Sequence, residues 1–203
     1  MLKLKSFVLL GISSLITLTG TSTFAAGGLF AEPMLTYESG ESTTSYGAPF
    51  ANSTGTIKGV GLGARLGFHL SEIFFLAADA RYAKPQVKDS SFNTDSNATA
   101  YNYGPVIGIQ VPILGLRVWA SSILGGELDP EISNGINMKF TKAQGYRVGA
   151  GFHILMLSLN LEYQDSNYGS TTVESAGSTP GNADSISLKN KAYIASLSFP
   201  LDF

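Results

Sequence analysis

The stretch GVGLGARLGFHL, from Gly59 to Leu70, alternates between two kinds of residue. Every even position is apolar, whereas the odd positions hold glycine, arginine and histidine. A period of two is typical of a β-strand whose two faces meet different surroundings. The pattern therefore predicts a strand with one continuously apolar face, and what covers that face decides the class of protein.

The same alternation recurs in seven further segments, which predicts eight strands in all. These segments are residues 27–37, 73–83, 101–111, 116–124, 145–154, 155–164 and 192–203. Three of the predicted connections are short: 71–72, 112–115 and a tight turn near Ile154. The other four are long and polar: 38–56, 84–100, 125–140 and 165–186. Short turns at one end and long loops at the other are typical of bacterial outer-membrane barrels.

The composition indicates that water does not cover the whole surface. Only 14% of the residues are charged, against about 25% in typical soluble domains. Beyond the N-terminus no apolar run is long enough for a membrane-spanning helix, so a membrane would have to be crossed by strands. The chain has no cysteine, so disulfides do not stabilise it.

The N-terminus has the order of a secretory signal peptide. Lys3 and Lys5 precede an apolar run from Phe7 to Leu18, and small residues follow. Cleavage is predicted after Ala25, which divides the chain into a signal peptide, residues 1–25, and a barrel domain, residues 26–203. Loss of the two lysines takes the formal net charge from −2 to −4. Such mild acidity gives no support to nucleic-acid binding.

The residues on the two faces distinguish a lipocalin-like barrel from a membrane barrel. A soluble barrel would carry lysine, glutamate and threonine on its polar face, but this face is rich in glycine, which suits a crowded, narrow interior. The apolar face separates tyrosines toward the long loops from phenylalanines toward the short turns, as the two aromatic girdles of a membrane barrel do. The sequence therefore predicts an all-β, eight-stranded antiparallel up-and-down transmembrane β-barrel.

Charged residues on the glycine-rich face are predicted to lie inside the barrel. Buried charges must be paired, so we expect a structural network of ion pairs, with Trp119 obstructing the same lumen and Asp202 at its lower mouth. The alternative is a narrow polar channel through the same side chains. The predicted network comprises Glu32, Arg65, Asp79, Arg81, Arg117, Arg147 and Glu162.

Three lysines fall on the alternating positions that are expected to face outward, and each lies twelve residues above the lower end of its strand. They are Lys58, Lys142 and Lys191. Twelve residues of a tilted strand rise roughly 30 Å, beyond an apolar band of about 25 Å. At that height we expect them to contact lipopolysaccharide phosphates; the alternative is that they extend into solvent.

The terminal segment AYIASLSFPLDF resembles the C-terminal assembly signal of small eight-stranded Gram-negative outer-membrane proteins, the OmpA-barrel, OmpX and OmpW-like group. The outward residues that carry this resemblance are Tyr193, Leu197, Phe199, Leu201 and Phe203. It implies delivery by periplasmic chaperones, insertion by the barrel assembly machinery and residence in the outer membrane among its lipids and lipopolysaccharide. The resemblance is architectural and does not identify a subfamily.

We expect a non-enzymatic protein that acts in envelope structure or binds a surface ligand through its extracellular loops, without a cofactor or metal. A porin-like channel for ions or small solutes, including hydrophobic ones, is the alternative. A lipid A-modifying enzyme is a weaker one, because His69, Ser71 and Glu72 resemble a hydrolase set. His69, however, is predicted to face the lumen rather than the lipid, and Ser71 to shape a turn.

Overall fold

The computed structural model describes residues 28–89, 94–131, 136–175, 181–183 and 185–203, so the predicted signal peptide lies outside the described residues. One 3-10 turn, η1 (Pro112–Leu114), interrupts the strands, and within the described ranges no helix is long and apolar enough to cross a membrane. The strands are β1 (Leu29–Ser45), β2 (Ser53–His69), β3 (Phe74–Asp89), β4 (Thr94–Val111), β5 (Leu116–Ile123), β6 (Gly125–Pro130), β7 (Ile136–Ile154), β8 (Leu157–Ser175), β9 (Gly181–Asn182), β10 (Ser187–Ser198) and β11 (Leu201–Asp202).

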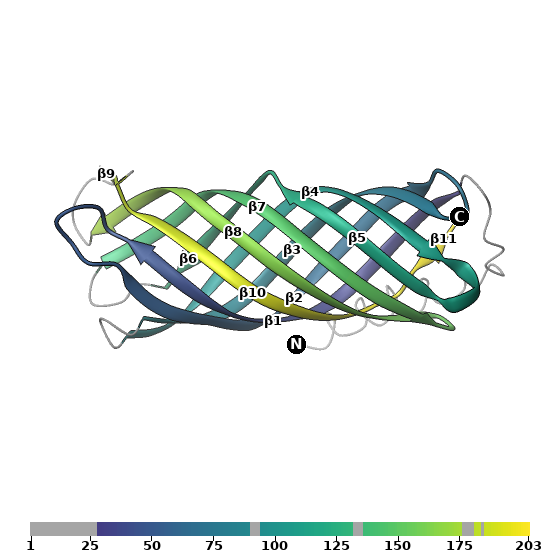
Figure 1. Cartoon of the computed structure of the whole chain (residues 1–203). Helices are drawn as coiled ribbons and strands as arrows, with labels where there is room; N and C mark the ends of the chain where they lie inside the picture. The colour runs from purple at the N-terminus through teal and green to yellow at the C-terminus, as the bar shows by residue number, and fades with distance from the viewer. Residues whose placement is uncertain (1–27, 90–93, 132–135, 176–180, 184) are drawn as a thin grey trace, which may run out of the picture.

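The sheet closes on itself because β1 pairs with β2 on one side and with β10 on the other, as Figure 1 shows. All neighbouring strands are antiparallel, and β8 joins β10 to β7. β5 and β6 form one wall strand interrupted at Leu124, and β10 and β11 form another interrupted at Phe199 and Pro200. The wall is thus a ring of eight strands, which confirms the predicted fold class.

The apolar face of the alternating strands lies outside. On β2, Val60, Leu62 and Leu66 are 59–63% exposed, whereas Arg65 between them is 1% exposed. The predicted girdle residues are outward as well. Those that are at least two-fifths exposed are Tyr37, Tyr82, Tyr101, Tyr103, Tyr146 and Tyr193 toward one end, and Phe68, Phe74, Phe152, Phe199 and Phe203 toward the other.

The strands extend much farther than the sequence pattern predicts. Most of the four segments expected as long loops is strand: β1 continues to Ser45, β3 to Asp89 and β8 to Ser175. A strand of 19 residues such as β7 rises roughly 45–50 Å at the usual tilt, about twice the height of the apolar band. The upper part of the wall therefore stands outside the lipid, where both faces can be polar and the alternation that marks a strand disappears.

The upper wall contains a β-bulge near Leu124. Val106 of β4 pairs with Ser121, but Tyr103 pairs with Gly125, so the wall strand gains one residue relative to β4. On the neighbouring β7, Lys142 has a φ of 58°. Odd-numbered residues face inward from Ala143 onward, whereas even-numbered Phe140 faces inward before it, and both Phe140 and Ala143 are buried. This change of parity is why a period-two pattern could not predict the inward residues of β6 and β7 above this level.

Candidate functional site

The structure places all seven residues of the predicted network inside the barrel, where each is at most 8% exposed. We call this set the charge layer: Glu32, Arg65, Asp79, Arg81, Arg117, Arg147 and Glu162. Strand register brings its members together. Glu32, Arg65 and Asp79 lie opposite one another across β1, β2 and β3, and Trp119 and Glu162 are both paired with Gly149.

Glu32 joins four strands in the lower part of the charge layer. Its carboxylate accepts hydrogen bonds from Arg65 Nη1 and Arg117 Nη1, each at 3.2 Å, and from Arg117 Nη2. Ser198 Oγ on β10 donates to the same carboxylate at 2.5 Å. Such charge-assisted bonds are about twice as strong as neutral ones, so Glu32 links segments far apart in the sequence.

Arg81 binds two carboxylates in the upper part of the layer. Its Nε and Nη2 donate to Asp79, both at 2.9 Å. Its Nη1 and Nη2 donate to Glu162 at 2.5 and 2.9 Å. Arg147 completes this group through Nη1 to Asp79 at 3.0 Å, Nε to Gln164 Oε1 at 2.7 Å, and Nη2 to Asn102. The guanidinium groups and carboxylates are thus held by one another.

Trp119, the single tryptophan of the chain, lies across this layer. Its Nε1 donates to Glu162 Oε1 at 2.7 Å, and the Arg65 guanidinium carbon lies 4.7 Å from the ring centroid. Trp119 also packs with Phe30, Phe75 and Val106 in what we call the lower cluster. An aromatic plug thus lies directly beneath the charges.

The glycines of the inner face make room for these large side chains. A Cβ added to Gly149 would lie 2.6 Å from the Trp119 ring and 2.7 Å from Glu162 Cγ, and one added to Gly108 would lie 2.2 Å from the Phe75 ring. The inner face is therefore rich in glycine because the large side chains of neighbouring strands fill the space that a Cβ atom would take.

The substitution Gly149→Ala is expected to lower the free energy of unfolding by about 1–3 kcal/mol, because Trp119 and Glu162 must both move. Urea unfolding in lipid vesicles, followed by circular dichroism, measures the change. Gly169→Ala is the matched control, since a Cβ there meets nothing within 4 Å. Equal stability of the two variants would contradict the close packing.

The lower mouth holds a polar contact that ties the C-terminal strand to β2. His69 Nε2 lies 3.3 Å from Asp202 Oδ1, and His69 Nδ1 lies 3.3 Å from Gln110 Nε2. The His69 ring packs on Phe30, with a centroid distance of 4.9 Å. Asp202 was expected at this mouth, and its partner is His69 rather than an arginine of the charge layer.

The residues of the hydrolase alternative do not form a catalytic group. Ser71 Oγ accepts from the backbone N–H groups of Ile73 and Phe74, at 3.3 and 3.1 Å, so it shapes the turn. Both nitrogens of His69 face Asp202 and Gln110 instead of Ser71. Among the residues that the structure describes, no group of three metal-ligating side chains occurs either.

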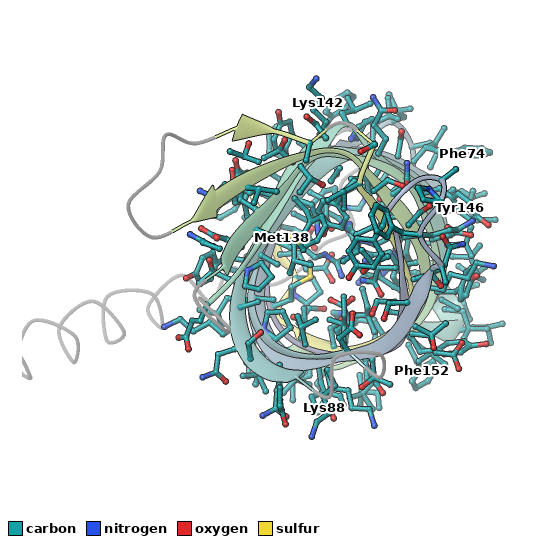
Figure 2. The ribbon with its side chains drawn as sticks, turned by 90° about the vertical axis from the view of Figure 1, so that its left-hand side faces the viewer. Phe74, Lys88, Met138, Lys142, Tyr146 and Phe152 are labelled. Atoms are coloured by element: carbon teal, nitrogen blue, oxygen red, sulfur yellow. The ribbon has the colours of Figure 1, made fainter. Side chains whose placement is uncertain are left out.

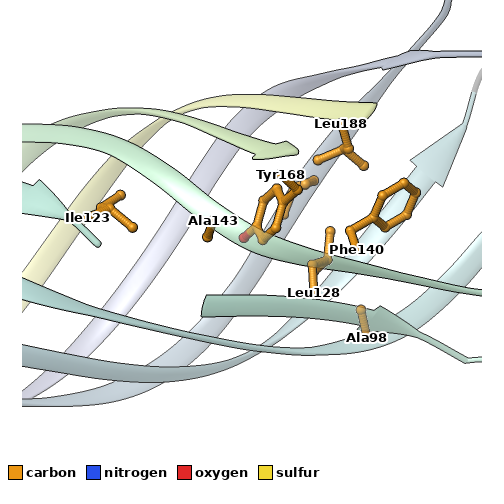
Figure 3. Packing of buried hydrophobic residues seen from close by; sticks show 8 residues of the cluster. Ala98, Ile123, Leu128, Phe140, Ala143, Tyr168 and Leu188 are labelled. Atoms are coloured by element: carbon orange, nitrogen blue, oxygen red, sulfur yellow. The ribbon is translucent and has the colours of Figure 1, made fainter. Parts of the chain in front are cut away.

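Above the charge layer lies an apolar plug that the sequence analysis missed, the upper cluster shown in Figure 3. Most of its members come from segments expected to be loops or loop edges. Ile57 and Ile123 continue the inward odd parity of β2 and β5 and could have been predicted. The members are Ile57, Ala98, Ile123, Leu128, Phe140, Ala143, Tyr168 and Leu188.

Glu38 is a further interior carboxylate that the sequence analysis assigned to a loop. It continues the inward even parity of β1 and accepts a hydrogen bond from Asn190 Nδ2 at 2.6 Å. It lines a cavity of about 20 Å³ with Arg81 and Gln164 beneath it and Tyr168 and Leu128 among the upper walls. A volume of this size holds about one water molecule, so the void that these residues line between the charge layer and the upper cluster is small.

The predicted lysines all lie on the outside of the wall, but their surroundings differ. Lys58 and Lys142 are exposed, whereas Lys191 Nζ lies 3.9 Å from Asp165, which also pairs with Lys189 at 3.4 Å. The view along the barrel in Figure 2 shows Lys142 and Lys88 projecting outward on opposite sides, with Met138 within the ring. By register, Lys58 and Lys191 lie on the two strands that flank β1, whereas Lys142 lies on β7.

The C-terminal segment keeps its outward alternation through the break at Pro200. Tyr193, Phe199 and Phe203 are 63%, 44% and 63% exposed, and Leu197 and Leu201 are half-buried. The backbone N–H of Phe203 donates to the Leu29 carbonyl at 2.9 Å, so this segment closes the lower rim against β1.

No protein-family model matches the chain, and no curated protein sequence matches it. Solved structures do. The outer membrane protein OprG from Pseudomonas aeruginosa matches with a TM-score of 0.52 at 10% identity, over 87% of this chain and 96% of OprG. Neisserial surface protein A (NspA) matches with a TM-score of 0.46 at 10% identity, over 84% of this chain and 96% of NspA.

The outer membrane protease OmpT from Escherichia coli matches with a TM-score of 0.42 at 10% identity, over 87% of this chain and 97% of OmpT. At such low identity a likeness concerns the fold alone, and OprG provides the stronger match. The chain is an eight-stranded antiparallel β-barrel, similar in fold to the outer membrane protein OprG.

Proposed function

We propose that this protein is a non-enzymatic, non-conducting barrel that serves envelope structure or surface interaction at its extracellular end. The observation that carries the proposal is the filled interior. The lower cluster, the charge layer and the upper cluster follow one another along the axis, and the void lined by Glu38 and Arg81 measures about 20 Å³. A pore would need a continuous wet path through all three.

The upper wall supports a role at the cell surface. Strands such as β7 and β8 continue well above the tyrosine girdle, and the connection between β1 and β2 is only residues 46–52. A rigid wall presents side chains in fixed positions, which lowers the entropy cost of binding compared with long loops. We therefore place the interacting surface on the strand extensions and the turns that join them.

The proposal also includes a route of export and assembly. Residues 1–25 serve as a cleaved signal peptide, and periplasmic chaperones and the barrel assembly machinery act on the chain. The outward row that contains Leu197, Phe199 and Phe203 is the segment the machinery would read. Its support is the apolar alternation that persists at the closing rim.

Planar-bilayer recording tests the proposal. Protein purified from the outer membrane is expected to give no steady conductance, and Arg117→Ala is expected to stay silent because the two apolar clusters remain in place. A known porin in the same bilayer is the positive control. Steady conductance that changes with Arg117→Ala would overturn the proposal in favour of the narrow channel.

A further inference from the structure

Three lysines gather on one side of the outer wall, on the neighbouring strands β2 and β3. Lys58 lies opposite Gln86, and Lys84 and Lys88 lie two residues below and above Gln86 on the same outward face. All three side chains are exposed. Diagonal neighbours in an antiparallel pair are about 7–8 Å apart, so two or three of these ammonium groups can reach one ligand. We call Lys58, Lys84 and Lys88 the lysine patch.

The height of the lysine patch matches the polar edge of the membrane. Tyr82 of the tyrosine girdle is two residues below Lys84 on the same face, and Tyr101 lies opposite Tyr82. Two residues of a tilted strand rise about 5 Å, which places the three lysines roughly 5–15 Å above the girdle. Girdle tyrosines mark the interface between acyl chains and headgroups. The patch therefore lies at the level of lipid headgroup phosphates.

The lysine patch carries more positive charge than its surroundings neutralise. Lys88 Nζ pairs with Asp95 at 2.7 Å, whereas Lys58 and Lys84 have no ion pair with any residue that the structure describes. Lys142 of β7 likewise has no ion pair with a residue that the structure describes, but the remaining outward lysines differ. Lys139 pairs with Glu127 and Asp129 at 3.0 and 3.2 Å.

Hydrogen bonds to Glu127 and Asp129 also raise the pKa of Lys139 above its usual value. Lys189 and Lys191 share Asp165. Each of these lysines thus has a carboxylate of the protein within ion-pair distance, although Lys189 and Lys191 divide one negative charge between them. Lys58 and Lys84 have no carboxylate within ion-pair distance among the residues that the structure describes, although Glu41 is a diagonal neighbour of Lys58 on β1. Their charge can therefore attract an anion from outside.

We propose that the lysine patch binds the phosphate groups of a phosphorylated glycolipid of the outer leaflet, a lipid A-type molecule with a phosphate at each end of its headgroup. Directly below the lysines, Val60 and Leu62 are 59% and 63% exposed, so acyl chains can lie on the wall while the headgroup meets the ammonium groups. This amphipathic fit favours a lipid over free phosphate.

Neighbouring side chains complete the site. Gln86 between the lysines is exposed and provides an amide donor for phosphate oxygens. Asn97 of β4, opposite Gln86, already donates from Nδ2 to Glu131 Oε2 at 3.3 Å. Asp95 is the carboxylate that pairs with the patch, and it competes with a phosphate for Lys88. Removing its charge should therefore strengthen binding, an effect that loss of folding cannot imitate.

Native mass spectrometry of the purified protein, titrated with lipid A bearing two phosphates, tests the proposal. The double variant Lys58→Gln/Lys84→Gln is expected to bind roughly 25-fold more weakly, since each lysine near a charged lipid surface contributes on the order of a factor of five. Asp95→Asn is expected to bind severalfold more tightly. Lys191→Gln is the control at similar height and should bind like the unaltered protein, because Lys191 lies on β10, outside the patch on β2 and β3, and already contacts the Asp165 carboxylate.

Two further titrations distinguish the ligands. Lipid A without phosphates, with the same acyl chains, is expected to bind the unaltered protein and the double variant equally weakly. Inorganic phosphate at millimolar concentration should not displace the lipid. Equal affinity of the double variant and the unaltered protein for the phosphorylated lipid would overturn the proposal, as would displacement by inorganic phosphate, which would indicate a simple anion site.

Discussion

The substitution Glu162→Gln is expected to lower the free energy of unfolding by about 3–5 kcal/mol, the usual cost of removing one partner from a buried ion pair. Glu162 is 1% exposed and accepts from Arg81, Arg65 and Trp119. Glutamine keeps the size of the side chain and an oxygen for Trp119 Nε1, so the effect measures the loss of charge. Arg81 and Arg65 would be left with too little negative charge.

Urea unfolding in lipid vesicles measures this change, and the fluorescence of the single tryptophan reports directly from the charge layer. Glu41→Gln is the matched control. Glu41 is exposed on the outside of β1, and surface substitutions usually stay within about 0.5 kcal/mol. A Glu162→Gln variant as stable as the Glu41→Gln variant would show that the charge layer does not stabilise the barrel.

The substitution Phe140→Ala is expected to destabilise the protein by about 3–5 kcal/mol, as for other buried phenylalanines. Phe140 is 4% exposed within the upper cluster and pairs with Leu128 across β6 and β7. This part of the wall extends beyond the lipid, so the upper cluster holds it together against water by the hydrophobic effect. Burial of a phenylalanine inside the barrel brings this hydrophobic stabilisation only where water surrounds the wall, because lipid would solvate the same side chain equally well on the outside.

Phe50→Ala is the control for the upper cluster, because Phe50 is 70% exposed in the connection between β1 and β2. It should change stability little. Hydrogen exchange adds a local test: amides of β6 and the upper part of β7 should lose protection in Phe140→Ala, while those of the lower wall keep it. Uniform loss of protection in the upper and lower wall would mean that the upper cluster does not stabilise the upper wall independently of the rest of the barrel.

The lower half of the barrel was predictable from the sequence because one physical condition acts there on every strand. Lipid cannot accept a backbone hydrogen bond or solvate a charge, so each outward position must be apolar and each polar side chain must face inward. That condition alone predicted eight strands and their lipid-facing side. It also assigned seven charged residues to the inner face, where the structure places them.

Above the tyrosine girdle the same condition no longer acts, and the prediction failed. Polar residues such as Thr43 and Asn167 face water on the outside of strands that the sequence indicated as loops. The bulge near Leu124 and the change of parity at Lys142 then place Phe140 inside the barrel. Phe140 joins the upper cluster through these local departures from the alternation, whereas Ile57 and Glu38 keep the inward parity of their strands.

The sequence by itself determined which segments cross the membrane and which face meets lipid, because these properties depend only on neighbours within one strand. The tertiary structure decided which charges meet: Glu32 with Arg117, Asp202 with His69, and Lys58 beside Lys84 and Lys88. These contacts depend on the register between strands and on the closure of β1 against β10. Register is a property of two segments together, and an alternating pattern in either one leaves it undetermined.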